Sequence, residues 1–436
     1  MARRYIRIFA VNLILFGLFA EIAGLFLYYV NTGAFFYTHQ RAAEQIPDTP
    51  EGRLSGDALH PYFGPTHMPG LPLQVPPELR DGTAAAETAA NPTGARTNNF
   101  GFVSVHDFPF VKTRSTQFVI GIFGGSVSAW FCHVGTPRLL ASLKMDASFS
   151  EREIVPLCFS HEGYKQPQQL LILAYFLSIG QEFDLVINID GFNEVALSPH
   201  NEQSGLDLSM PSPFHMEGLI NLIDRSTLTP ERLLVMAQIY RLREQLNGLA
   251  VRLQRTPFAS MYAILDRYYA STRTRYFTEL GRFSNLPGSS GAASMIRITP
   301  AVIPRDEAKV FEDIAAQWAQ SSLLMNSMLA ERGVPYFHFL QPNQYFTTRR
   351  FTEPERATAL NVDSPFKAGA EKGYPALIAA ANLLTGRERF FNAVDIFNRE
   401  PLPVYLDDCC HYTLTGYERL ADAVSASVLR AEALWR

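Results

Sequence analysis

The chain has 436 residues, carries a formal net charge of −4, and only 18% of its residues are charged. This length can bury a sizeable core, in one elaborated domain or in two smaller ones. No basic stripe or basic tail stands out, so we expect no nucleic-acid partner.

The most apolar stretch lies at the N-terminus, at residues 8–30. A run of this length can cross a bilayer as one helix. Three arginines lie in the first seven residues, and the next basic residue after the run is Arg41. This asymmetry predicts a cytoplasmic N-terminus and a single-pass protein whose remaining residues are exported to the periplasmic side of the cytoplasmic membrane. A cleaved signal peptide is the competing interpretation, although the run is long for one and no A-x-A site follows it.

One acidic residue, Glu21, interrupts this apolar run. An ionised carboxylate in hydrocarbon is costly unless it has a partner or becomes neutral. Two interpretations follow: Glu21 is protonated or adjusted to the membrane interface, or it contacts another membrane subunit.

With a membrane anchor at its N-terminus, the sequence is expected to divide into three parts. Residues 1–30 are the cytoplasmic tip and membrane anchor, residues 31–116 are a tether and irregular lead-in rich in Pro, Gly, Ala and Thr, and residues 117–436 are one α/β domain. Two aromatic patches in the lead-in, 60–64 and 99–102, are expected to dock onto that domain.

Short apolar runs alternate with longer helical ones from residue 118 onward, which predicts a parallel sheet wrapped by helices. The expected strands are 118–123, 154–159, 184–189, 336–340 and a weaker 393–397. Expected helices lie at 166–178, at 308–332, and from near Thr415 towards the C-terminus. Residues of about 198–304 break the alternation and hold the helical segments 230–249 and 257–282, so we expect a helical insertion there.

The four cysteines are Cys132, Cys158, Cys409 and Cys410. In an oxidising exported compartment some of them are expected to pair, but the sequence does not determine which. The adjacent Cys409 and Cys410 cannot present the spaced pairs of a structural zinc site, so we predict no metal.

A candidate nucleophile, Ser126, directly follows the first expected strand and precedes a helical stretch. Open α/β sheets place their ligands at this carboxyl edge, and backbone N–H groups in such a turn can bind an oxyanion. The segment is not a G-x-S-x-G elbow, because Ser128 occupies the position of the second glycine. A helix-capping serine in an ordinary turn is the alternative.

A nucleophilic serine needs a base and a group that orients the base. The segment Asp408-Cys409-Cys410-His411 offers a carboxylate three residues before a histidine, with Asp407 as the neighbouring alternative. Asn193 follows the third strand, where its amide can donate to an oxyanion, or simply form a turn.

These residues resemble the four blocks of the SGNH hydrolases, also called GDSL-like esterases and lipases. Ser126, Gly163, Asn193 and His411 fit the blocks in order, with Gly-Gly-Ser in place of Gly-Asp-Ser and Glu194 in place of the customary aspartate. The resemblance covers roughly residues 97–431 apart from the insertion. It implies a three-layer α/β/α, flavodoxin-like parallel sheet of strand order 2-1-3-4-5, a Ser126, His411 and Asp408 catalytic set, and an oxyanion hole formed by Ser126, Gly163 and Asn193.

The expected function is a serine esterase or acyl hydrolase that acts on an O-acyl ester of a lipid or glycan without a cofactor. One alternative is an O-acyltransferase that serves an exported polysaccharide and needs a multi-span membrane partner. Another is a non-catalytic glycan-binding scaffold. Gln341 and Asn343 follow the fourth strand at the same edge and are weaker candidates for substrate contact, while His133 is expected on a helix surface or in the pocket lining.

Overall fold

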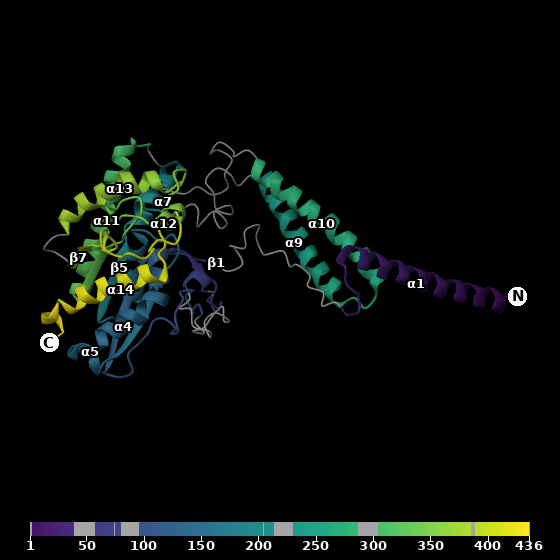
Figure 1. Cartoon of the computed structure of the whole chain (residues 1–436), viewed down its shortest axis with the longest axis horizontal. Helices are drawn as coiled ribbons and strands as arrows, with labels where there is room; N and C mark the ends of the chain where they lie inside the picture. Colours follow the sequence, from purple (N-terminus) through teal and green to yellow (C-terminus); the bar gives the residue numbers. More distant parts are fainter. Residues whose placement is uncertain are drawn as a thin grey trace. The chain divides into compact units, whose positions relative to one another are not determined.

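The computed structural model describes residues 2–38, 57–73, 75–79, 96–203, 205–212, 230–286, 304–384 and 389–435. The chain divides into two compact units (Figure 1). The first, which we call the helical unit, comprises Met1–Ser55 and Asn221–Ile298, and the second, the sheet unit, comprises Gly56–Ile220 and Thr299–Arg436.

The sheet unit is built on a five-stranded parallel sheet in the order β4-β3-β5-β6-β7. The strands are β3 (Gln117–Gly124), β4 (Glu153–Ser160), β5 (Leu185–Asp190), β6 (Tyr336–Leu340) and β7 (Arg389–Asn392). The predicted order, with the first strand between the second and third, is therefore confirmed. All residues of β3, β5 and β6 are buried, as their continuous apolar runs predict.

The fifth strand is earlier in the chain than the predicted 393–397. Phe390 and Phe391 form the pairing segment, because Phe391 stacks on Phe339 with ring centroids 4.8 Å apart, while Phe390 contacts Trp318 edge-on at 5.7 Å. The apolar residues after Asn392 instead form a turn, in which Ile396 N–H donates to the carbonyl of Ala393. The prediction of a strand at 393–397 was wrong. Arginine and glutamate residues directly precede Phe390 and Phe391, so the aromatic pair does not form a continuous apolar run of the kind that predicts a buried strand.

Helices cover both faces of the sheet. Along β3, Phe118, Ile120 and Ile122 belong to one buried apolar cluster, and the alternating Val119 and Phe123 belong to another. Most of the helices of this unit contribute side chains to the first cluster. They are α3 (Ser126–Trp130), the π-helical turn η2 (Phe131–Gly135), α4 (Thr136–Lys144), α5 (Ala147–Ser150), α7 (Phe192–Gln203), α11 (Glu307–Ala330), α12 (Glu353–Ala359), α13 (Lys367–Ala380) and α14 (Leu414–Leu429). The second receives them from α6 (Gln168–Ser178) and the last turns of α11. Short 3-10 turns complete the unit: η1 (Pro77–Leu79), η3 (Ala381–Leu383) and η4 (Glu432–Leu434).

The described part of the lead-in packs onto this unit. It includes an antiparallel hairpin, β1 (Asp57–His60) and β2 (Gly64–His67), followed by irregular segments. Phe63 and Phe102, from the two aromatic patches, are each only 1% exposed in the second cluster. Residues 39–56 and 80–95 of the expected tether lie outside the described residues. A disulfide between Cys132 and Cys158 joins η2 to β4.

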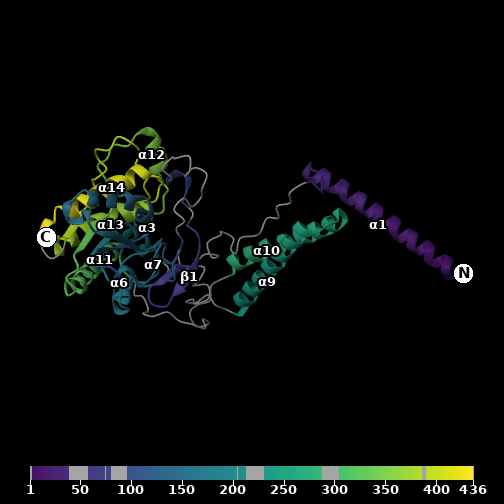
Figure 2. The same cartoon turned by 90° about the horizontal axis from the view of Figure 1, so that it is seen from below.

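The helical unit contains α1 (Ala2–Thr32), α9 (Pro230–Arg255) and α10 (Ala259–Asn285). The two helices expected within the insertion are thus present and longer than predicted, and they lie side by side (Figures 1 and 2) around a small core of Leu242, Leu246 and Tyr276. They group with α1 rather than with the sheet. Among the described residues, one helix, Arg4–Thr32, is exposed, long and apolar enough to be a membrane anchor or signal sequence.

Candidate active site

Four adjacent strands deliver the candidate residues to one edge of the sheet. Ser126 follows β3, Gly163 follows β4, Asn193 follows β5, and the segment 341–344 follows β6. Because the strands are parallel, all of these residues leave the sheet at its carboxyl edge.

Ser126 is the first residue of α3 and lies against the turn that carries Asn193. The preceding residue, Gly125, makes this approach possible, since a Cβ atom there would lie 2.1 Å from Asn193 Nδ2. The glycine therefore brings the start of α3 into contact with the residue that follows the neighbouring strand.

His411 lies between Ser126 and Asp407. Its Nε2 is 2.8 Å from Ser126 Oγ, and its Nδ1 is 2.5 Å from Asp407 Oδ2. An ionised carboxylate can only accept, so Nδ1 carries the proton and Nε2 is left as the acceptor for the serine hydroxyl. This is the hydrogen-bond order that activates a serine nucleophile.

The carboxylate that orients the histidine is Asp407, the alternative, and not the predicted Asp408. Three successive backbone N–H groups, of Cys409, Cys410 and His411, converge on Asp407 Oδ1 at 2.9, 3.0 and 3.2 Å. Asp408 Oδ2 instead accepts from Asn361 Nδ2 at 2.8 Å. The turn of the loop thus selects the carboxylate four residues before the histidine.

The charge of Asp407 is favoured by these contacts. Burial opposes ionisation, but the hydrogen bonds from His411 and from the loop backbone outweigh it and hold the pKa of the Asp407 carboxyl below its ordinary value. A negative Asp407 stabilises the imidazolium that forms when His411 accepts a proton.

Asn193 and Gly163, the predicted oxyanion donors, follow the two strands that flank β3. Asn193 Nδ2 donates to the carbonyl of Tyr164 at 2.9 Å, which fixes the amide between the segments after β4 and β5. An amide nitrogen has two hydrogens, so one N–H remains for a ligand. Gly163 has φ +73, a conformation that favours glycine and turns the backbone after β4.

Glu194, which departs from the family pattern, is buried and bridges two turns. Its Oε1 accepts from Gln166 N–H at 2.8 Å, and its Oε2 accepts from Gly191 N–H at 2.9 Å. The longer side chain therefore ties the segment after β4 to the turn that presents Asn193.

Gln341 and Asn343 do not face solvent, so the prediction that they contact substrate is not supported by their positions. Asn343 is fully buried, and its Nδ2 donates to the carbonyl of Cys409 at 3.2 Å. Gln341 is 3% exposed, and its backbone carbonyl accepts a hydrogen bond from the Tyr374 hydroxyl. The neighbouring Gln344, which no sequence pattern singles out, donates from Nε2 to the backbone carbonyl of Asp407 at 3.0 Å. The segment after β6 braces the loop that carries Asp407 and His411.

Cys410 is a second potential nucleophile near the site, with its Sγ 4.0 Å from Ser126 Oγ. Burial raises the pKa of the Cys410 thiol well above its ordinary value. Since the thiolate is the reactive form, this thiol is held in its inert state.

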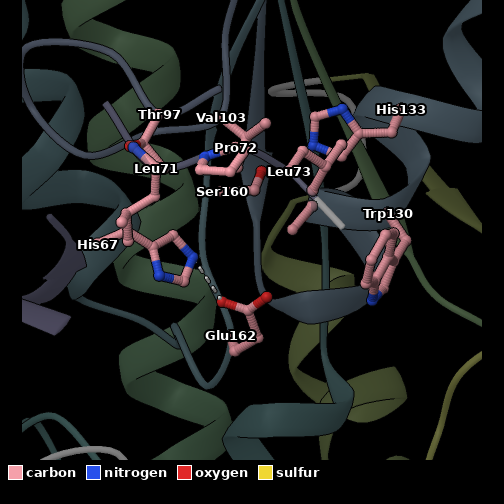
Figure 3. A pocket seen from close by; sticks show the side chains of 11 residues that line it. His67, Leu71, Pro72, Leu73, Thr97, Val103, Trp130, His133, Ser160 and Glu162 are labelled. Carbon is pink, nitrogen blue, oxygen red and sulfur yellow. Dashed lines mark hydrogen bonds and ion pairs between the residues drawn. The ribbon is translucent and has the colours of Figure 1, made fainter. Parts of the chain in front are cut away.

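A cavity of about 200 Å³ lies beside the helix that begins at Ser126 (Figure 3). Its lining residues come from the lead-in, from α3 and η2, and from the end of β4: His67, Leu71, Pro72, Leu73, Thr97, Val103, Ala129, Trp130, His133, Ser160 and Glu162. His133 therefore lines the pocket, and burial lowers its pKa to about 4.

Two groups of described residues have ligand atoms close enough for one metal ion. Cys409, Cys410 and His411 form the first, and His67, His161 and Glu162 form the second, with the ligand atoms of each group within 4.8 Å of one another. His411 in the first group is engaged with Ser126 and Asp407. In the second, His67 Nε2 lies 3.3 Å from Glu162 Oε2, a distance that an ion pair explains without a metal.

No known family model matches the chain, and a search of curated proteins finds no match.

Proposed function

We propose that this chain is a serine esterase of the SGNH kind, anchored in the cytoplasmic membrane by α1, with its sheet unit exported and acting on an O-acyl ester of a lipid or glycan. The observation that carries the proposal is the continuous hydrogen-bonded series from Ser126 through His411 to Asp407, with contacts of 2.8 and 2.5 Å. The sheet order and the four ordered blocks also agree with the three-layer α/β/α, flavodoxin-like fold of this family.

In the first half of the reaction, Ser126 Oγ attacks the acyl carbonyl carbon while His411 Nε2 accepts the hydroxyl proton. Asp407 holds the imidazole through Nδ1 and offsets its new positive charge. The tetrahedral intermediate collapses when His411 returns the proton to the leaving alcohol oxygen, which leaves an acyl-serine.

The negative oxygen of the intermediate needs hydrogen-bond donors that are already in place. The Ser126 N–H is suited to this role because the first N–H groups of a helix have no intrahelical acceptor. The Gly163 N–H and the second amide hydrogen of Asn193 are the other proposed donors. Their strands adjoin β3 on either side, so both residues follow neighbours of the strand that precedes Ser126, which supports this assignment.

In the second half, His411 removes a proton from the molecule that attacks the acyl-serine. Water gives hydrolysis, and a sugar hydroxyl gives transfer. The two outcomes share the same acyl-enzyme, so the product formed with and without an added glycan acceptor distinguishes them.

The decisive test uses full-length protein in lipid nanodiscs and a fluorophosphonate probe, which labels only activated serines. We expect wild-type protein to be labelled, and Ser126→Ala and His411→Ala to lose labelling while keeping their folded circular dichroism spectrum. Ser128→Ala is the matched control, since Ser128 Oγ already donates to the carbonyl of Phe123. Labelling that survives in Ser126→Ala, or is missing from folded wild-type protein, would overturn the assignment.

A further inference from the structure

The carboxylate of Glu21, inside the apolar run of α1, holds the first turn of α10. Its Oε1 accepts from Ala259 N–H at 2.7 Å, and its Oε2 accepts from Ser260 N–H at 3.1 Å and Ser260 Oγ at 2.7 Å. The Tyr37 hydroxyl also donates to Oε1, at 2.8 Å. A side chain of one helix therefore caps the N-terminus of another, where unpaired N–H groups and the helix dipole favour a negative charge.

The two helices are in close contact around this cap. A Cβ atom at Gly24 would lie 2.4 Å from Ser260 N, so only glycine permits the observed approach. One turn later, the ring of Tyr28 meets that of Tyr262 edge-on at 5.0 Å, and Phe36 meets Tyr262 at 5.7 Å. The first turns of α10 are thus fixed to the second half of α1.

The positions of arginine and tyrosine along α1 indicate the depth of this contact. Arg7 and Tyr28 are 21 residues apart, which is about 31 Å of helix and matches the roughly 30 Å of bilayer hydrocarbon. Tyr28 and Tyr29 have the composition of an outer interfacial belt. Glu21 lies seven residues before Tyr28, so the cap is about 10 Å below that belt.

The start of α10 has the composition that such a depth requires. Residues 258–265 carry no charge, and the first charged side chain, Asp266, is seven residues after Ala259, a rise of about 10 Å. Phe258, Met261 and Ile264 are 56%, 52% and 72% exposed. The uncharged length of α10 therefore agrees with the depth derived from α1.

Two exposed arginines, Arg252 and Arg255, lie in the last turn of α9, beside this apolar segment. Arginine side chains can keep their stems in an apolar layer while the guanidinium reaches lipid phosphates. Apolar side chains next to such cations are typical of segments that lie within one leaflet of a membrane.

We propose that the tip of the α9–α10 hairpin, residues 252–265, is inserted in the outer leaflet of the membrane that α1 spans. Phe258, Met261 and Ile264 contact acyl chains there, and Arg252 and Arg255 contact phosphates. This inference rests on the proposed insertion of α1, but it does not depend on the esterase activity. It gives Glu21 a partner within its own chain, in place of a second membrane subunit.

The test measures depth-dependent quenching of tryptophan fluorescence in nanodiscs whose lipids carry bromine at defined chain positions. Ile264→Trp reports on the hairpin tip. Leu234→Trp is the matched control, because Leu234 is 73% exposed but lies in the second turn of α9, near the other end of the hairpin. Phe16→Trp, in the middle of the apolar run, reports on α1 itself. The signal of the three native tryptophans is subtracted with wild-type protein.

We expect bromolipids to quench Trp at positions 16 and 264, with shallower bromine positions more effective at 264, and to leave position 234 unchanged. Quenching at 16 but not at 264 overturns the hairpin proposal and leaves the anchor in place. Failure to quench at 16 overturns the anchor itself. Trp at 264 that is shielded from both bromolipid and aqueous iodide indicates a protein partner on this face, which also contradicts lipid contact.

A second comparison tests the cap. Glu21→Ala removes every acceptor that α10 receives from this side chain, whereas Glu21→Gln keeps one carbonyl acceptor. Bromolipid quenching at position 264 is expected to fall strongly in the alanine variant and partly in the glutamine variant. Equal quenching in all three backgrounds would mean that Glu21 does not hold the hairpin in place.

Discussion

Asp407 Oδ2 lies 2.5 Å from His411 Nδ1, a contact that spans four residues of one loop. The carboxylate is fixed on its other side by three backbone N–H groups. The imidazole therefore meets an acceptor whose position is set by the loop itself, so that the ring orientation needed by Ser126 exists before substrate binds.

Replacing Asp407 should affect turnover much more than replacing Asp408. We expect Asp407→Asn to lower kcat by about 10³- to 10⁴-fold, because the amide favours the wrong histidine tautomer. Asp408→Asn, its matched control, should change kcat little, since Asp408 contacts Asn361 and not His411. Steady-state hydrolysis of a p-nitrophenyl ester measures both, and the opposite ranking of the variants would return the role to Asp408.

Removal of the Asn193 amide should weaken stabilisation of the oxyanion. Asn193→Ala is expected to lower kcat by about 10²- to 10³-fold with a smaller change in KM, the usual effect of losing one such donor. Asn193→Asp should be at least as damaging, because its charge opposes the oxyanion. A loss confined to KM would show that Asn193 binds the ground state instead.

Cys410 should not substitute for Ser126, despite the 4.0 Å between its Sγ and the serine Oγ. Since burial raises the pKa of this thiol well above its ordinary value, little thiolate exists at neutral pH. We expect Cys410→Ala to keep most esterase activity and Ser126→Ala to lose it. Iodoacetamide labelling of Cys410 in folded Ser126→Ala protein would contradict this view.

Removal of one partner from the buried ion pair between Arg349 and Glu355 should strongly destabilise the sheet unit. Their side chains are 1% and 0% exposed, and Arg349 also donates to the carbonyls of Phe397, Glu400 and Leu402. Glu355→Ala leaves the arginine charge without its partner, so we expect a loss of about 3–5 kcal/mol in unfolding free energy. Urea denaturation measures it.

The control for this pair is an exposed one, Lys372 and Glu307, whose nitrogen and oxygen atoms lie 2.7 Å apart. Glu307→Ala is expected to cost at most about 1 kcal/mol. Similar losses of unfolding free energy in Glu355→Ala and Glu307→Ala would show that burial does not increase the cost of breaking the Arg349–Glu355 pair.

His133 should make the sheet unit sensitive to mild acid. Burial lowers its folded-state pKa to about 4, against 6.5 for an ordinary histidine. Between these values the unfolded chain binds the extra proton, so stability falls as the pH drops from about 6.5 to about 4. His133→Gln should reduce the difference in Tm between pH 7 and pH 4.5, by an amount corresponding to about 2 kcal/mol. An unchanged difference would mean that His133 is freely protonated in the folded state.

Much of the site could be predicted because each residue is tied to the end of a strand. Ser126, Gly163 and Asn193 follow apolar runs that are recognisable one at a time, and parallel strands bring their ends together. The choice between Asp407 and Asp408 depends on the turn taken by the backbone of residues 409–411, which residue spacing does not encode. The burial of Gln341 and Asn343 likewise depends on how the loop of residues 407–411 packs over the end of β6.

The grouping of α1 with α9 and α10 could not be predicted from local sequence patterns. The contact between Glu21 and Ala259 joins positions 238 residues apart, and it follows from a geometric match between one carboxylate and one helix N-terminus. The sequence showed that Glu21 is either neutral, adjusted to the membrane interface, or in contact with a partner. It did not show where along the chain that partner lay.

Ser126 and His411 are 285 positions apart in the chain. During synthesis the serine, its turn and the first three strands are therefore complete long before the histidine exists. Contacts between distant segments form late in folding, so the loop that is proposed to activate the nucleophile docks late. On the proposed mechanism, the serine of a nascent chain stays unreactive, and the protein becomes able to take up an acyl group only when its final segment docks.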